Sequence, residues 1–178
     1  MFDDRQAALP APRERGINRV AQGKKYYFED FIPGSTWEIQ GPTLSKEDIV
    51  EFAAKYDPQY FHVDAERAKH SAYGGLIASG WQTVSLCMRM TCDCYLLESA
   101  SLGSPGVDKV RWKQPVRPGD SLRMRVTVLK ATASRTKPDR GTLLSLWEVF
   151  NQRNELVMTM EGYGILARRS ADPDHSSS

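Results

Sequence analysis

The chain has 178 residues, of which 40% are hydrophobic and 26% are charged. This length favours one domain with a single core and is too short for two domains of ordinary size. Its 24 basic and 22 acidic residues leave a formal net charge of +2, which excludes a strong overall field for nucleic acid or an anionic membrane. We therefore expect a small molecule or another protein as the partner.

The ends of the chain differ from its middle. Residues 1–24 are rich in Ala, Pro, Arg and Gln without periodicity, so we interpret them as an N-terminal extension, and we interpret residues 169–178 as a disordered polar tail. Residues 25–168 are then one domain. The N-terminus lacks the apolar stretch of a signal peptide, and no apolar run is as long as a membrane span. We expect a cytoplasmic protein.

The first predicted elements are a strand at residues 35–40 and a helix that begins after Ser45. Ser45 can cap the amide of Asp48 while Asp48 reaches back to Ser45. Pro58 ends this helix, because the residue before a proline avoids the helical conformation. Asp57 therefore stands at a helix end, either as a solvated carboxylate or as one aimed at a ligand.

A second candidate follows closely. His62 lies between Phe61 and Val63 in the sequence, which predicts partial burial in a loop, either as a structural or as a catalytic histidine. Asp64 is expected to cap a short helix over residues 64–69. His70 ends that helix, where a cation is favourable, so its predicted role is structural.

The long apolar helix pattern from Leu76 to Leu97 is the centre of the chain. It is apolar nearly all round, which predicts a buried helix with a sheet around it. Its thiols, Cys87, Cys92 and Cys94, are expected to be core residues in a reducing compartment, because metal or CxxC spacing is lacking. Gly80 near its start could leave an N–H for a developing oxyanion, or could only permit close packing on the sheet.

Strand patterns follow the helix. They cover residues 106–114, 121–129, 142–151 and 155–166, with turn chemistry at 115–120 and 137–141 and a hairpin at 151–154. The sequence therefore predicts an α+β fold in which one antiparallel sheet wraps around one long central helix.

These motifs together resemble the MaoC-like dehydratases, a hot-dog-fold family that includes the (R)-specific enoyl-CoA hydratases. The resemblance covers residues 26–168 and rests on five features in order. They are a Tyr-x-Glu-Asp-like N-terminal strand, the Ser-capped helix, Asp57-x-x-x-x-His62-x-Asp64, Gly-Gly-Leu-Ile-Ala-Ser-Gly80 and Val-Arg-Trp-Lys-Gln-Pro-Val-Arg-Pro-Gly-Asp120. It implies that Asp57 and His62 activate a water and that the Gly80 amide holds the thioester carbonyl.

The chain departs from the family pattern at three places. Gln59-Tyr60 replaces Asn-Pro, Ser79 replaces a histidine, and Met88 replaces a hydroxyl residue found in some hydratases, which removes one polar contact in the pocket. Together with Trp81, these departures predict a subgroup with its own substrate. Gln59, Ser79 and Trp81 are the expected substrate contacts.

The implied reaction is reversible addition of water to a trans-2-enoyl-CoA, giving a (3R)-hydroxyacyl-CoA. Coenzyme A belongs to the substrate, so we expect no cofactor and no metal. Five cations could reach its phosphates or could form solvated strand faces: Lys109, Arg111, Lys113, Arg117 and Arg123. A homodimer is expected, because a single sheet leaves an edge open. The alternatives are a hot-dog thioesterase, although Leu76–Ser85 lacks a carboxylate, and a non-catalytic acyl-thioester-binding subunit.

Overall fold

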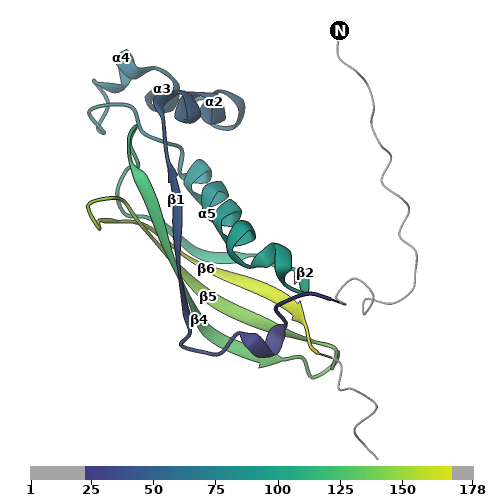
Figure 1. Ribbon diagram of the computed structural model, residues 1–178. Helices are drawn as coiled ribbons and strands as arrows, with labels where there is room; N and C mark the ends of the chain where they lie inside the picture. The colour runs from purple at the N-terminus through teal and green to yellow at the C-terminus, as the bar shows by residue number, and fades with distance from the viewer. Residues whose placement is uncertain (1–22, 170–178) are drawn as a thin grey trace, which may run out of the picture.

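An antiparallel sheet curves around one long helix (Figure 1). The computed structural model describes residues 23–169. The helical elements are η1 (Phe28–Asp30), α2 (Lys46–Tyr56), α3 (Tyr60–Val63), α4 (Ala65–Ala68), α5 (Gly80–Cys94) and η2 (Leu96–Glu98). The strands are β1 (Thr36–Thr43), β2 (Ser101–Gly103), β3 (Val107–Trp112), β4 (Ser121–Ala133), β5 (Arg140–Phe150) and β6 (Leu156–Ala167). The predicted extension and tail lie outside the described residues, except for Gly23, Lys24 and Arg169.

The sheet has the order β1-β4-β5-β6-β2, and β3 also pairs with β6. Every pairing is antiparallel. Burial alternates along β4 and β5, as the sequence pattern predicted, so that one face of each strand is buried. Met124, Val126 and Val149 on that face are fully buried and share a core cluster with Cys87 and Met90 of α5. The predicted α+β architecture is confirmed.

Helix α5 is less buried than its apolar pattern predicted. It begins at Gly80 rather than Leu76, and Trp81, Met88 and Cys94 are exposed. The prediction of three core thiols is therefore wrong for Cys94. Cys87 fits it, and burial raises the pKa of its thiol to about 12. The sheet covers only one side of the helix, so apolar residues on the other side stay accessible.

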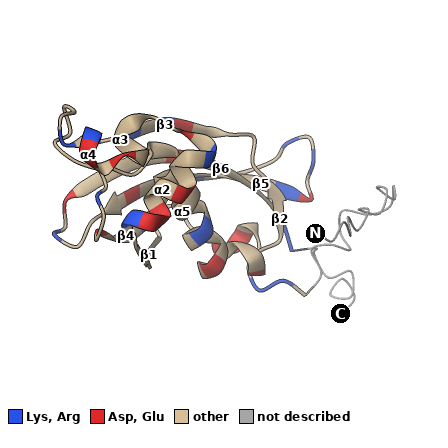
Figure 2. Ribbon diagram, turned by 90° about the horizontal axis from the view of Figure 1, so that it is seen from above, with Lys and Arg blue, Asp and Glu red and all other residues tan. Residues whose placement is uncertain are grey.

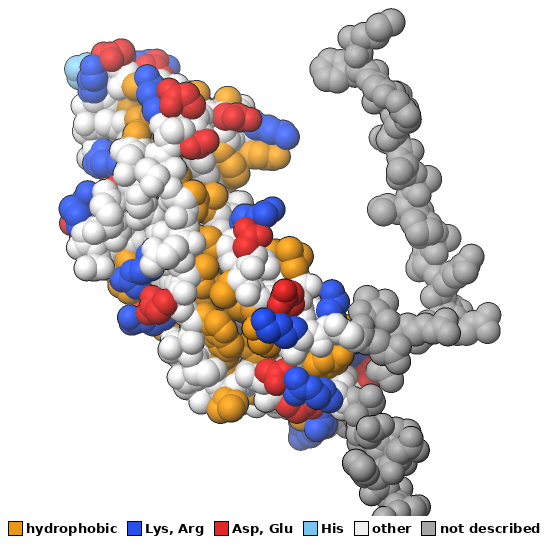
Figure 3. Space-filling model, viewed as in Figure 1, with side chains coloured by type: hydrophobic (Ala, Val, Ile, Leu, Met, Phe, Trp, Pro, Cys, Tyr) orange, Lys and Arg blue, Asp and Glu red, His pale blue; other side chains and the backbone are white. Residues whose placement is uncertain are grey.

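A groove beside α5 shows the same incomplete cover. It runs between α5 and β1, and Ile39, Leu86 and Met90 are among the residues that line it. Apolar side chains are visible between charged ones along this part of the surface (Figure 3). Charged residues of both signs are scattered over the helices (Figure 2). No helix within residues 23–169 is long and apolar enough to cross a membrane.

Strand β3 contains a bulge that changes which residues face the helix. Asp108 pairs with Glu161 and Arg111 pairs with Thr159, so β3 has one residue more than β6 between these pairs. Lys109 within the bulge has a φ of 53°, which is uncommon for a residue with a side chain. The bulge reverses the alternation. Trp112 therefore lies opposite Met158, a fully buried residue on the helix side of the sheet.

The N-terminal segment also differs from its predicted extended form. Phe28–Asp30 forms the short helix η1, and Tyr26 makes only an isolated bridge to Ser99 within the described part of the chain. The Asp30 side chain accepts a hydrogen bond from the Tyr27 N–H at 2.7 Å. This local bond favours a turn over a strand.

Candidate active site

The end of helix α2 positions Asp57. The predicted capping box is present, since the Asp48 N–H lies 3.0 Å from Ser45 Oγ and the Ser45 N–H lies 2.8 Å from Asp48 Oδ2. At the other end Asp57 is the C-cap, and its N–H donates to the Ala53 carbonyl at 2.8 Å. Its φ of −154° takes the chain out of the helix. Asp57 therefore projects from a rigid element at the start of an irregular connection.

His62 lies on the single turn of α3 rather than in the predicted loop, and it is only 4% exposed. Its Nδ1 is 2.8 Å from the Ile77 carbonyl oxygen. A carbonyl can only accept, so Nδ1 carries a proton, and Nε2 is the ring nitrogen that remains to accept or release one. Nε2 lies 3.3 Å from Asp57 Oδ2. The structure thus brings the two predicted catalytic residues together.

Two side chains hold the Asp57 carboxylate. The Ser79 hydroxyl donates to Oδ2 at 2.7 Å, and Gln59 Nε2 donates to Oδ1 at 2.8 Å. Burial raises the pKa of this carboxyl, but the hydrogen bonds from Ser79 and Gln59 and the adjacent His62 outweigh burial. The pKa of Asp57 therefore lies below its usual value, and the group is an anion at neutral pH. Gln59 and Ser79, predicted to contact substrate, both contact Asp57.

Gly80 begins helix α5, so its N–H has no partner within the helix. The Ser79 hydroxyl caps the helix by accepting from the Trp81 N–H at 3.2 Å. A Cβ at Gly80 would lie 2.5 Å from Nε1 and 2.8 Å from Cζ2 of Trp112. The indole of Trp112 also donates to the Gly80 carbonyl at 3.1 Å. A side chain at position 80 would therefore force the indole of Trp112 to shift.

These residues line one pocket of about 460 Å³. Asp57, Gln59, His62, Gly80 and Trp81 all contribute to it, and Ser79 reaches it through Asp57. The remaining lining residues are Phe61, Tyr73, Ile77, Ala78, Thr83, Trp112, Lys113, Gln114, Pro115, Val116 and Val157. Met88 is exposed and lies outside this lining. A methionine in place of the family's hydroxyl residue therefore does not change the pocket within this chain.

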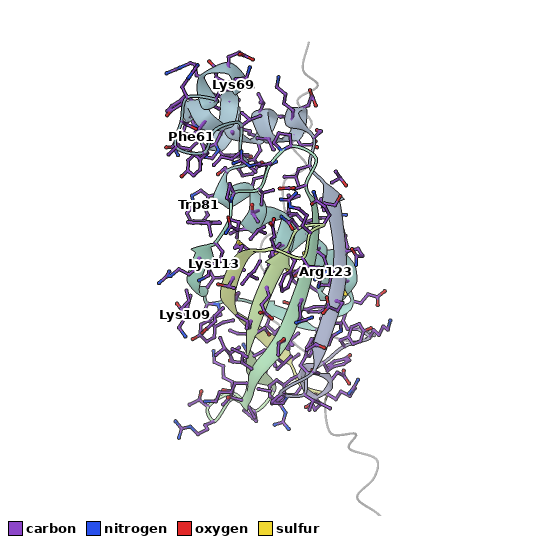
Figure 4. All side chains as sticks on the ribbon, turned by 90° about the vertical axis from the view of Figure 1, so that its left-hand side faces the viewer. Phe61, Lys69, Trp81, Lys109, Lys113 and Arg123 are labelled. Carbon is purple, nitrogen blue, oxygen red and sulfur yellow. The ribbon has the colours of Figure 1, made fainter. Side chains whose placement is uncertain are left out.

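The predicted cations are not equivalent. Lys113 lines the pocket, and Figure 4 shows it on the same side of the molecule as Trp81. Lys109 pairs with Glu161 at 2.7 Å. The other three cations bind to groups of the protein itself. Arg111 donates to the Val110 carbonyl, Arg117 donates to the Tyr73 carbonyl, and Arg123 pairs with Glu38.

Within residues 23–169, no group of three or more His, Cys, Asp and Glu side chains is arranged to hold an ion. The set of groups gathered around Asp57 includes one carboxylate, one imidazole and one helix N-terminus. That set suits transfer of a proton beside a polarised carbonyl oxygen.

Comparison with known proteins decides the family. Residues 24–145 match the MaoC-like domain. The chain belongs to this family. The uncharacterized protein YdeM of Bacillus subtilis is 31% identical over 141 residues, which cover 79% of this chain and 98% of that protein. The 3-hydroxyacyl-thioester dehydratase Z of Mycobacterium tuberculosis is 36% identical over 83 residues, which cover 46% of this chain and 55% of the dehydratase.

Solved structures agree with this assignment. The MaoC-like dehydratase from Rhodospirillum rubrum has a TM-score of 0.74 and 36% identity, over 80% of this chain and 97% of that one. The (R)-hydratase from A. caviae has a TM-score of 0.60 at 23% identity, over 76% of this chain and 97% of that one, and so supports the fold alone. The resemblance drawn from the sequence and the predicted hot-dog fold are confirmed.

Proposed function

We propose that the protein adds water reversibly to a trans-2-enoyl-CoA and forms a (3R)-hydroxyacyl-CoA. The observation that carries this proposal is the pairing of Asp57 with His62 at 3.3 Å, in the pocket that also contains the start of α5. Family membership supports the coarser class of hydratase or dehydratase. A relative named as a 3-hydroxyacyl-thioester dehydratase fits the same chemistry.

The proposed reaction uses one water and one proton shuttle. Neutral His62 accepts a proton from the water at Nε2 while the water oxygen bonds to the β-carbon of the enoyl group. The resulting imidazolium returns a proton to the α-carbon, so the base of the first step is the acid of the second. Anionic Asp57 accepts a hydrogen bond from the water and stabilises the imidazolium. Coenzyme A is part of the substrate, and this chemistry requires no separate cofactor.

Negative charge develops on the thioester oxygen as the water adds. The Gly80 N–H is the proposed donor to this oxygen, because an N–H at the head of a helix suits a developing anion. Lys113 is the proposed contact for a coenzyme A phosphate, since it lines the pocket on the side of Trp81 (Figure 4).

Substitution of the pair tests the reaction. Asp57→Asn and His62→Ala should each lower turnover by at least about a hundredfold, because general acid-base groups contribute factors of 10² to 10⁴. The assay follows loss of the conjugated thioester absorbance over a panel of enoyl-CoA substrates, with free CoA measured in parallel. Near-normal hydration by either variant would exclude the proposed chemistry.

Matched controls are available outside the pocket. The control variants are Asp93→Asn and His70→Ala, and both should keep wild-type turnover. Asp93 pairs with Arg89 on α5 at 2.7 Å, and His70 is exposed. Release of free CoA would favour the thioesterase alternative. Binding without turnover by the wild-type protein would favour the non-catalytic subunit.

A further inference from the structure

Trp112 is a pocket residue that links the edge strand β3 to the first peptide of α5. Its indole N–H donates to the Gly80 carbonyl at 3.1 Å. On the other side of the same peptide unit, the Trp81 N–H donates to Ser79 Oγ at 3.2 Å. The peptide between residues 80 and 81 is therefore held at its C=O by Trp112 and at its N–H by Ser79.

Ser79 also connects this peptide to the catalytic pair, Asp57 and His62. Ser79 holds Asp57 Oδ2 at 2.7 Å, and that oxygen is 3.3 Å from His62 Nε2. A displacement of the first turn of α5 would thus change both the direction of the Gly80 N–H and the orientation of the carboxylate. Proton transfer and oxyanion stabilisation are sensitive to displacements of about 1 Å.

The backbone of β3 is built to place this side chain. Trp112 is five positions after Val107, an odd offset, so a regular strand would direct the two side chains to opposite faces. Because of the bulge at Lys109, Val107 lies opposite Gly162 and Trp112 lies opposite Met158. Both of these β6 residues are on the helix side of the sheet. A residue with a positive φ persists only where its surroundings determine it, and such residues concentrate near functional sites.

The indole is well placed but not rigidly buried. Trp112 is 48% exposed and Trp81 is 58% exposed, and their ring centroids lie 5.6 Å apart in an edge-to-face arrangement. Hydrogen bonding and packing against Gly80 therefore hold Trp112, rather than enclosure in the core. A small change at Gly80 can displace it without disrupting the core.

We propose that Trp112 is a positioning residue, which orients the start of α5, and with it the Gly80 N–H and the Asp57 carboxylate, for catalysis. This inference rests on the proposed hydratase function. It assigns a role in that site to a residue 32 positions beyond Gly80. It also relates the glycine at position 80 to the close approach of the indole.

Kinetics on Trp112→Phe test the positioning role. Phenylalanine keeps a ring beside Gly80 but removes the N–H donor, so kcat should fall about tenfold, the rate equivalent of one lost hydrogen bond. KM and the melting temperature should change little. The control is Leu129→Ala on β4, an exposed side chain outside the pocket lining, which should keep wild-type kcat. A Trp112→Phe variant with kcat within about twofold of wild type would overturn the proposal.

A double-mutant cycle in thermal unfolding tests the contact itself, independently of any reaction. Gly80→Ala should lower the melting temperature, because its Cβ would overlap the indole. In the Trp112→Ala background the same change should cost little or nothing, since alanine suits a helix better than glycine. Equal losses in both backgrounds would show that the indole does not press on Gly80, and would overturn the proposal. If the wild-type protein hydrates no enoyl-CoA, the proposed function fails, while this cycle still decides the contact.

Discussion

Ser79 serves two structural needs with one hydroxyl group. The hydroxyl accepts from the Trp81 N–H as the cap of α5, and it donates to Asp57. Ser79 is fully buried, so water cannot replace it without a change in the packing. The residue that differs from the histidine of the family pattern thus connects the helix start to the carboxylate.

Removal of this hydroxyl should weaken the catalytic carboxylate. In Ser79→Ala the pKa of Asp57 should rise, because a hydrogen bond to the anionic form that lowers the pKa is lost. The free energy of unfolding should fall by about 1 kcal/mol with loss of the cap. Carbon-13 NMR titration of the Asp57 carboxyl measures the first effect, and denaturant unfolding measures the second.

Ser79→Thr is the control for this prediction, since it keeps the hydroxyl. An unchanged titration midpoint in Ser79→Ala would mean that Gln59 and His62 alone maintain the low pKa. Because its pKa is lowered in the folded protein, Asp57 also makes the stability of the folded state depend on pH. The stabilisation is present above the unfolded pKa of the carboxyl and is lost as pH falls through the lower folded value.

The sequence marked candidate site residues but not their contacts. Local patterns left Asp57, His62 and Gly80 each with a structural alternative, the family resemblance implied their roles, and the structure places all three in one pocket. The sequence did not mark Trp112, because its contact with Gly80 spans 32 residues and depends on the register of β3. The bond between His62 and the Ile77 carbonyl likewise depends on a loop that folds back, which local patterns do not specify.

At the scale of elements, β3 shows where the pattern was ambiguous. Residues 107–112 read Val-Asp-Lys-Val-Arg-Trp, which places apolar residues on one face only if an extra residue is inserted. Strands β4, β5 and β6 alternate more regularly and were predicted within a few residues of their bounds. The extent of α5 was overestimated because an apolar pattern does not say how much of a helix the sheet covers.

The bulge gives a prediction for stability. Lys109→Val should lower the free energy of unfolding by about 1–2 kcal/mol, because a β-branched residue is unfavourable at a positive φ. Lys109→Gly should leave it unchanged or raise it, since glycine adopts this conformation freely and the lost ion pair with Glu161 is exposed at Lys109. Denaturant unfolding measures both, and Lys130→Val on β4 is the control. Equal stability of the two Lys109 variants would contradict this explanation of the bulge.

At the scale of the whole molecule, the open edge of the sheet predicts self-association. Within the described residues β3 pairs with β6 alone, and Val107, Trp112, Trp81 and Met88 are exposed large apolar side chains on β3 and α5. We expect a homodimer at least, because unpaired strand edges with apolar neighbours favour association. Sedimentation equilibrium should give at least twice the mass of the chain. A stable and active monomer at micromolar concentration would contradict this prediction.

The two ends of the described chain lie next to each other. The Ala100 N–H donates to the Tyr26 carbonyl and the Ala167 N–H donates to the Ala100 carbonyl, both at 2.8 Å. Arg169 pairs with Asp30 at 2.8 Å. These contacts lie at the end of the molecule opposite α2, α3 and α4 (Figure 1). A short linker could therefore join residues 23 and 169 in a circularly permuted chain, with new termini opened far from the pocket.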